Sequence, residues 1–206
     1  MSEKFLKDAY GLGLGSPQAT HAHYQKWASS YDAEVGAHGY ASPGRVADAL
    51  WSKLPEPQTP ILDYGCGTGL SGVALRAAGF EVIDGVDPTP KMLERAEAKG
   101  IYRKLSTFEI TDPDPLEQGA YKAITAIGVI GTGAAPPEVF DLVMNALPKG
   151  GLLGFSFNDH TLAEISYTSR LNDWLDMGAA RLLFREHGPH LPGMDLKSDV
   201  YIVEKA

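Results

Sequence analysis

The sequence predicts an α/β fold built on a doubly wound, mostly parallel sheet of seven strands. From residue 60 onward, short apolar runs alternate with amphipathic segments, as a parallel sheet with crossover helices requires. Glycine follows two of the amphipathic segments, at Gly79 and Gly100, which is the usual way for a helix to end. The last two apolar runs have no helix between them, so they predict a terminal antiparallel hairpin.

Two helices are expected before the sheet, and each begins at a Ser-Pro pair. Ser16 and Ser42 can cap free backbone N–H groups, and proline suits the first turn of a helix. The first helix would cover "PQATHAHYQKWASSYDAEV", residues 17–35, and the second "PGRVADALWSKL", residues 43–54. The Pro-rich stretch that follows is typical of a connector.

Strands and helices then alternate along the core. The expected strands are 61–64, 81–87, 104–110, 123–130 and 152–157, and the expected helices are 70–78, 90–99, 137–147 and 162–177. We expect the ligand to bind at the carboxyl ends of the strands, where doubly wound sheets bind ligands. The chain is expected to form a single domain, with residues 1–56 as a helical lid region and residues 57–206 as the α/β core.

A glycine-rich turn follows the first expected strand. In "DYGCGTG", Gly65, Gly67 and Gly69 remove Cβ atoms where the strand turns into a helix. A dinucleotide fingerprint needs a third glycine where Leu70 stands, and a Walker phosphate loop needs a Gly-Lys-Ser/Thr ending. The turn therefore disfavours both kinds of phosphate ligand.

Two carboxylates frame this turn at the ends of neighbouring strands. Asp63 precedes the glycines, where it would repel a pyrophosphate and attract an ammonium group. Asp87 ends the next strand about 20 residues after the loop, where an acidic residue can accept both hydroxyls of a ribose. Asp84, three positions earlier on that strand, would face the other side of the sheet. The implied ligand has a cationic end and a ribose, without a phosphate near the loop.

These residues resemble a known family. The stretch "ILDYGCGTGLSGVALRAAGFEVIDGVDPTPKMLERAEAKG" is similar to the first two motifs of class I S-adenosylmethionine-dependent methyltransferases, and "ALPKGGLLGFSF" is similar to their fifth strand and the turn before it. The resemblance covers residues 61–157. It implies a Rossmann-like fold, S-adenosylmethionine as cofactor and S-adenosylhomocysteine as product.

The resemblance also implies which residues contact this cofactor. Those expected beside its methionine part and ribose are Asp63, Gly65, Cys66, Gly67, Asp87, Pro88, Met92 and Gly128. The adenine would meet the carboxylate of Glu109 and the backbone N–H of Ile110, with Asp112 as the competing carboxylate.

The first N-terminal helix carries an aromatic stripe. Tyr24, Trp27 and Tyr31 stand at i, i+3 and i+7, so they share one helix face, which either packs against the core or covers the cofactor. The stretch "YQKWASSYDAEV" resembles an element found in a methyltransferase-like group named for the Williams-Beuren region. That resemblance implies a lid, in which all three side chains would lie beside the cofactor and Tyr31 would face its sulfonium.

The sequence contains few candidates for catalysis. His160 follows the fifth expected strand at the predicted active edge and suits a general base, and Tyr31 is the second candidate catalytic residue. The family's Asn/Asp-Pro-Pro-Tyr motif for planar nitrogen acceptors is missing after the fourth strand, where the chain reads "IGVIGTG". We therefore expect methyl transfer to a small molecule. The alternatives are a noncatalytic S-adenosylmethionine-binding protein and a nicotinamide-dependent oxidoreductase.

Composition limits the partners. The 206 residues carry a formal net charge of −8, with 26 acidic against 18 basic side chains, which argues against nucleic acid as a partner. Cys66 is the only cysteine, which excludes an internal disulfide and a Cys-rich zinc site, and no metal site is expected. The sequence shows neither a signal-type segment nor a membrane-spanning run, so we expect a cytoplasmic protein, monomeric or homodimeric, without a membrane partner.

Overall fold

The computed structural model describes residues 5–6, 16–110, 112 and 116–206. Within them, seven strands form one sheet in the order β3-β2-β1-β4-β5-β7-β6. The strands are β1 (Ile61–Tyr64), β2 (Ile83–Val86), β3 (Lys104–Ser106), β4 (Ala123–Ala126), β5 (Leu152–Asn158), β6 (Ala180–Leu191) and β7 (Leu196–Lys205). The first five pair in parallel, whereas β7 pairs antiparallel to both β5 and β6. The predicted fold class and the terminal hairpin are confirmed.

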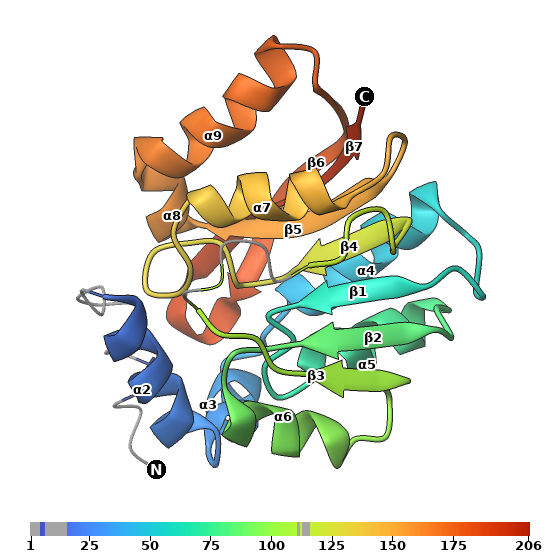
Figure 1. Ribbon diagram of the computed structural model, residues 1–206. Helices are drawn as coiled ribbons and strands as arrows, with labels where there is room; N and C mark the ends of the chain where they lie inside the picture. The colour runs from blue at the N-terminus through green and yellow to red at the C-terminus, as the bar shows by residue number, and fades with distance from the viewer. Residues whose placement is uncertain (1–4, 7–15, 111, 113–115) are drawn as a thin grey trace.

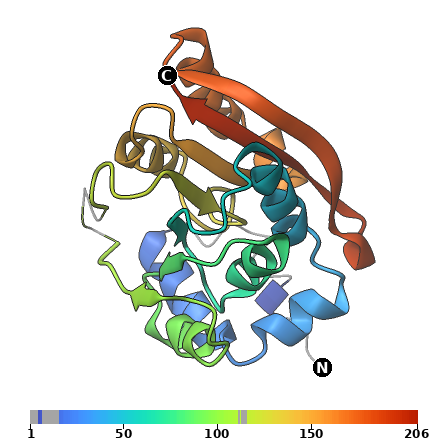
Figure 2. The ribbon, with the colours of Figure 1, turned by 90° about the vertical axis from the view of Figure 1, so that its right-hand side faces the viewer.

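Helices cover both faces of the sheet (Figure 1). On one face α4 (Ser42–Lys53) and α5 (Leu70–Ala78) contribute to a hydrophobic cluster, and on the other α7 (Glu138–Ala146) and α9 (Ile165–Asp176) contribute to a second one. Alternation along the strands divides the side chains between these clusters, so Ile61 joins the first and Leu62 the second. The long β6–β7 hairpin, orange and red in Figure 2, forms one edge of the sheet.

Several strands are shorter at their carboxyl ends than the sequence predicts. The strand expected at 123–130 ends at Ala126, and the strand expected at 104–110 ends at Ser106. Gly128 has φ +70°, a left-handed conformation that leaves the extended strand geometry. The residues after these strands are therefore available to form a binding surface above the sheet edge.

The helix expected at residues 17–35 is two helices, α2 (Pro17–Trp27) and α3 (Tyr31–Ala37). Between them the Ser30 N–H donates to the Trp27 carbonyl at 2.9 Å, closing a turn that ends the first helix. Ser16 caps α2 as predicted, since its hydroxyl accepts from the Ala19 N–H at 3.2 Å. In Figure 1 the arrows of β1, β2 and β4 point toward the side on which α2 lies. We call α2 and α3 the lid helices.

The prediction that Ser42 caps the second helix is wrong. Ala41 is the N-cap of α4, and the Ser42 hydroxyl is instead hydrogen-bonded to His190 Nδ1 at 2.7 Å and to Ser198 Oγ at 2.9 Å. Both partners belong to the β6–β7 hairpin, which lies far away in the sequence. Tertiary contacts have replaced the local cap.

The C-terminal helix expected at 162–177 is also divided, into α8 (Asp159–Ala163) and α9. Glu164 separates them with extended backbone angles, φ −93° and ψ 108°. The Asn158 side chain caps α8 by accepting from the Thr161 N–H at 2.9 Å. A short 3₁₀ helix, η1 (Pro192–Met194), joins β6 to β7. In the described part of the chain, every helix is too short or too polar to cross a membrane.

Candidate functional site

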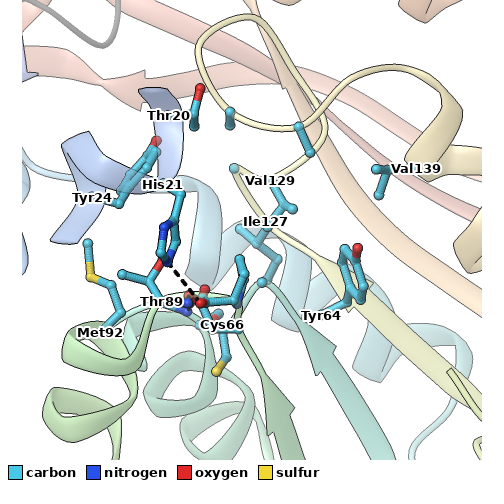
Figure 3. A pocket seen from close by; sticks show the side chains of 18 of the residues that line it. Thr20, His21, Tyr24, Tyr64, Cys66, Thr89, Met92, Ile127, Val129 and Val139 are labelled. Atoms are coloured by element: carbon cyan, nitrogen blue, oxygen red, sulfur yellow. Dashed lines mark hydrogen bonds between the residues drawn. The ribbon is translucent and has the colours of Figure 1, made fainter. Parts of the chain in front are cut away.

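A cavity of about 230 Å³ lies where the segments after β1, β2, β3 and β4 meet the lid helices. Its walls are mostly apolar and aromatic. The sheet side is formed by residues that follow the strands, among them Gly65, Cys66, Gly67, Thr68, Asp87, Pro88, Ile110, Asp112, Gly128 and Val129. The lid side is formed by Thr20, His21, Tyr24, Tyr31 and Tyr40. Figure 3 shows side chains of both groups facing the same space.

The glycine turn leaves bare backbone along one wall of the cavity. Gly65, Gly67 and Gly69 have φ values of +68°, +54° and +91°, which residues other than glycine rarely adopt. A Cβ atom at Gly65 would lie 2.5 Å from Val129 Cγ2, so the turn and the segment after β4 touch there. A Cβ atom at Gly67 would have its nearest neighbour at 3.9 Å, and this residue lines the cavity. A ligand can therefore approach the backbone of Gly67 closely.

Asp87 lies across the glycine turn, and its carboxylate is held by two backbone donors. Oδ2 accepts from the Gly67 N–H at 2.9 Å and Oδ1 accepts from the Thr89 N–H at 2.8 Å. Burial raises the pKa of this carboxyl group to about 6, since the two hydrogen bonds offset only part of the desolvation. Each carboxylate oxygen offers a further lone pair, which suits two neighbouring hydroxyls of a ribose.

Asp63 does not face the cavity, contrary to its expected contact with the ligand. It shares a sheet face with Ile61, and its carboxylate accepts from the hydroxyls of Ser71, Tyr102 and Thr125 at 2.5, 2.7 and 3.0 Å. The side chain is fully buried, and burial raises its pKa to about 6. Because Ser71 lies in the helix after the glycine turn, Asp63 holds that turn from behind.

The other predicted cofactor residues divide into two sets. Those that line the cavity are Gly65, Cys66, Gly67, Pro88, Met92, Ile110 and Gly128. Glu109 is exposed and lies outside the lining, whereas the competing carboxylate, Asp112, belongs to it. The Asp112 N–H donates to the Glu109 carbonyl at 2.9 Å. Burial raises the pKa of the Cys66 thiol far above its ordinary value, so it is neutral.

Three tyrosines form the aromatic part of the lid side. Tyr24 and Tyr31 of the stripe line the cavity, but Trp27 is buried with Val35 and Leu191 in a hydrophobic cluster against which both tyrosines pack. Burial and the charge of Asp87 raise the pKa of Tyr24 to about 12, which keeps its hydroxyl protonated.

Sequence reasoning missed Tyr40, which also lines the cavity. A Cβ atom at Gly128 would lie only 2.5 Å from the Tyr40 hydroxyl oxygen, so a glycine is required at position 128 for this contact. Tyr40 lies between α3 and α4, outside the periodic stripe, and no local pattern marks it.

The histidines are placed differently from the prediction. His160 is exposed on α8 and lies outside the cavity lining, so it is not positioned as a base there. His21 lines the cavity instead, and its Nε2 donates to the Pro88 carbonyl at 3.0 Å (Figure 3). A carbonyl only accepts, so Nε2 carries the proton. The lid helix α2 is thereby tied to the chain directly after Asp87.

A much smaller polar pocket adjoins the cavity and shares Tyr24, Gly128 and Ala134 with it. Its volume of about 20 Å³ is enough for one group the size of a water molecule. His190 lines it, and burial lowers the pKa of this imidazole to about 4, so the ring is neutral near pH 7. Among the residues that the structure describes, no three His, Cys, Asp or Glu side chains are grouped so that they could hold a metal ion.

A family model described as a methyltransferase domain matches residues 38–200. Human methyltransferase-like protein 27 is 35% identical over 162 residues, covering 74% of this chain and 63% of that protein. The 18S rRNA (guanine(1575)-N(7))-methyltransferase of Saccharomyces cerevisiae is 28% identical over 130 residues, covering 56% of this chain and 47% of that protein. The chain thus spans between about half and two thirds of the length of the curated relatives it matches.

Solved structures share the fold at low sequence identity. The structure of the [4+2]-cyclase SpnF has a TM-score of 0.68 at 14% identity, with 92% of this chain and 96% of that one covered. An S-adenosylmethionine-dependent methyltransferase from Mesorhizobium loti has a TM-score of 0.57 at 17% identity, with 76% of this chain and 96% of that one covered. The chain therefore belongs to the methyltransferase-domain family and has the class I methyltransferase fold.

Proposed function

We propose that this protein binds S-adenosylmethionine in the cavity and transfers its methyl group to a small-molecule acceptor. The observation that carries the proposal is Asp87, a buried carboxylate that two backbone N–H groups hold beside the bare backbone of the glycine turn. This arrangement suits a nucleoside with an amino-acid tail. When bound, the cofactor supplies an electrophilic methyl group on a positively charged sulfur.

The residues of the sheet side bind and orient the nucleoside. Asp87 accepts from the two ribose hydroxyls through its remaining lone pairs, and Pro88 and Met92 flank the ribose. Gly65, Cys66 and Gly67 leave room for the methionine part, and Gly128 flanks it from the opposite segment. Asp63 contributes indirectly, since it holds the turn through Ser71.

The adenine end is assigned to the segment after β3. Asp112, not Glu109, lines the cavity and is the carboxylate that accepts from the adenine amino group in this proposal. Ile110 lies beside it in the lining with Phe108, and both offer apolar surface to the ring. The contact expected at the Ile110 N–H remains part of the proposal.

The lid side excludes water and stabilises positive charge. Tyr24, Tyr31 and Tyr40 lie over the cavity, and the electron-rich faces of such rings attract a cation. Methyl transfer is an in-line displacement, in which alignment and exclusion of water supply most of the acceleration. His160 lies outside the described lining, and the hydrogen bond from Nε2 of His21 to the Pro88 carbonyl ties that ring to the chain itself. The proposal therefore assigns catalysis to proximity and assigns no base role to His160.

A small acceptor fits the chain better than RNA. The name of the yeast relative states an rRNA substrate, but that relative is 28% identical over 130 residues. Binding to RNA relies on Lys and Arg side chains that neutralise phosphates, whereas this chain carries a net charge of −8. None of the described residues that line the cavity is Lys or Arg.

Three finer assignments stay predictions. The 35% identity to human methyltransferase-like protein 27 supports placing the chain in the methyltransferase-like group named for the Williams-Beuren region. The cytoplasmic location and the monomeric or homodimeric state rest on the sequence alone.

Calorimetric titration with S-adenosylhomocysteine tests cofactor binding. We expect the wild type to bind and Asp87→Asn to bind roughly ten- to a hundredfold more weakly, because hydrogen bonds to a charged group contribute about 1.5–3 kcal/mol. Asp48→Asn is the matched control, since it also removes one negative charge, from an exposed position on α4 outside the cavity lining. Equal affinity of wild type and Asp87→Asn would contradict the assignment.

Labelled S-adenosylmethionine tests the acceptor. We expect label to pass to members of a panel of small phenols, amines and thiols, and not to total RNA. Transfer to RNA alone would overturn the small-molecule proposal. Binding without transfer to any acceptor, including a metabolite extract, would favour a noncatalytic S-adenosylmethionine-binding protein.

A further inference from the structure

Three segments that are distant in the sequence meet at Thr68, in the middle of the glycine turn. Thr68 stands between Gly67 and Gly69, is 2% exposed and lines the cavity. Lid helix α3 reaches it through Asp32, and the turn after α6 (Pro90–Glu97) reaches it through Lys99. Thr68 thus joins lid helix α3 to the glycine turn.

The contacts among these three residues form a closed triangle. The Thr68 hydroxyl donates to Asp32 Oδ1 at 2.5 Å, and Lys99 Nζ donates to Asp32 Oδ2 at 2.7 Å. Lys99 Nζ also donates to the Thr68 carbonyl at 2.6 Å. Two opposite charges therefore hold both the side chain and the backbone of one residue of the turn.

The position of Thr68 explains why such a hold matters. The glycines on either side of it have φ values of +54° and +91°, and glycine loses more conformational freedom on ordering than any other residue. A turn that is ordered before the ligand arrives avoids that cost during binding. Hydrogen bonds between charged groups are among the stronger contacts available for ordering it.

The triangle has little to contribute to overall stability. The side chains of Lys99 and Asp32 are 21% and 41% exposed, and ion pairs that are open to solvent stabilise a fold only weakly. Neither residue lines the cavity, so both act through Thr68. The hydrogen bond from His21 to the Pro88 carbonyl fastens the other lid helix at the ribose side and does not depend on this triangle.

We propose that Asp32 and Lys99 are positioning residues, which fasten the lid to the glycine turn through Thr68 and thereby set the affinity for the cofactor. The proposal rests on the proposed function, because it takes S-adenosylmethionine and S-adenosylhomocysteine as the ligands. It adds that removing either charge loosens both the turn and the lid, without removing any group that touches the ligand.

Titration calorimetry with S-adenosylhomocysteine tests it on the full chain. We expect Lys99→Met and Asp32→Asn each to weaken binding about five- to tenfold, and the double variant to bind about as weakly as either single variant, since residues of one network are not additive. Lys122→Met is the matched control, because Lys122 also pairs with an exposed carboxylate, that of Glu56 at 3.2 Å, outside the cavity lining. Its affinity should equal that of the wild type.

Two further readouts separate positioning from a general loss of stability. Hydrogen exchange with ligand bound should become faster in residues 17–37 of Lys99→Met, while its ligand-free melting temperature stays close to that of the wild type. Raising sodium chloride from about 50 to 500 mM should weaken wild-type binding more than binding by Lys99→Met, because salt screens the ion pair that the variant lacks. The ligand itself is a zwitterion without net charge.

The outcomes distinguish this proposal from the one before it. Single variants that bind S-adenosylhomocysteine within twofold of the wild type would overturn the positioning role. An additive double variant would overturn the shared network. A wild type that does not bind S-adenosylhomocysteine at all would instead refute the proposed function.

Discussion

Asp63 and Asp87 lie near the carboxyl ends of the neighbouring strands β1 and β2, and burial raises the pKa of each to about 6. Their partners differ. Three hydroxyls surround Asp63 behind the glycine turn, while two backbone N–H groups hold Asp87 at the cavity. Asp63 lies within β1, in register with Gly85, whereas Asp87 lies just beyond the end of β2, so the position relative to the strand end separates the carboxylate behind the turn from the one at the cavity.

The pKa of Asp63 predicts how the stability of the ligand-free protein depends on pH. Its folded-state value of about 6 lies above the unfolded value of about 3.9, so the native state binds more protons between these pH values. The contribution of Asp63 to the unfolding free energy is fully present below pH 4, and it is lost as the pH rises through 6. Asp63→Asn should therefore flatten the fall in unfolding free energy between pH 4 and 6, by up to about 1.4 kcal/mol per pH unit.

Urea unfolding at half-unit steps across this range measures the effect. Asp84→Asn is the control, because Arg103 and Tyr121 hydrogen-bond to its carboxylate and hold its pKa below the ordinary value. Titration of Asp84 changes the unfolding free energy mainly below pH 4. Between pH 4 and 6 the unfolding free energy of Asp84→Asn should therefore change with pH as steeply as that of the wild type. Identical slopes for Asp63→Asn and wild type would show that Asp63 does not titrate there.

At the scale of the elements, the glycine turn joins two segments that both line the cavity. Gly65 touches Val129, which lies in the segment after β4. The glycine turn and this segment therefore fit against each other. Patterns in the sequence predict the turn and the helix after it well, since both rest on local residue preferences. The first predicted helix is divided into α2 and α3, and Trp27 of α2 packs with Val35 of α3 and with Leu191, a contact that no local pattern shows.

Gly65→Ala should damage the turn more than a glycine substitution elsewhere. Its Cβ atom would lie 2.5 Å from Val129, and the residue would keep a φ of +68°, so steric overlap adds to backbone strain. Gly100→Ala is the control, because its φ is +63° but a Cβ atom there meets nothing within 4 Å. We expect about 1–2 kcal/mol of destabilisation for Gly100→Ala from strain alone.

Urea unfolding and calorimetry with S-adenosylhomocysteine measure both consequences. Gly65→Ala should unfold at a lower urea concentration than Gly100→Ala and lose most of its ligand affinity. Wild-type affinity in Gly65→Ala would show that the turn tolerates a side chain and would remove it from the proposed site.

At the scale of the whole molecule, the boundary expected at residue 56 cuts through the core. Val46, Ala47 and Leu50 of α4 are fully buried in the cluster that also contains Ile61 and Ile202. We therefore propose that α4 belongs to the α/β core and that the lid comprises the residues before it. The single-domain prediction is retained with this change.

Two truncations test this boundary. A chain starting at residue 41 should fold but bind S-adenosylhomocysteine at least tenfold more weakly, because it keeps α4 and lacks the lid helices. A chain starting at residue 57 should fail to fold, because it loses the α4 side chains that fill the core, and large core truncations cost about 2–5 kcal/mol for each residue. Circular dichroism and calorimetry report the two results. A folded 57–206 fragment would restore the boundary expected from the sequence.

The sequence by itself determined the fold class, the glycine turn and the place of Asp87 at the cavity, because each depends on residues close together in the chain. Only the tertiary structure decided that Asp63 lies behind the turn, that Asp112 replaces Glu109 in the lining, and that Tyr40 joins it. It alone brings together Asp32, Thr68 and Lys99. Such placements depend on where strands end and on how segments far apart in the sequence pack, and local preferences do not encode either.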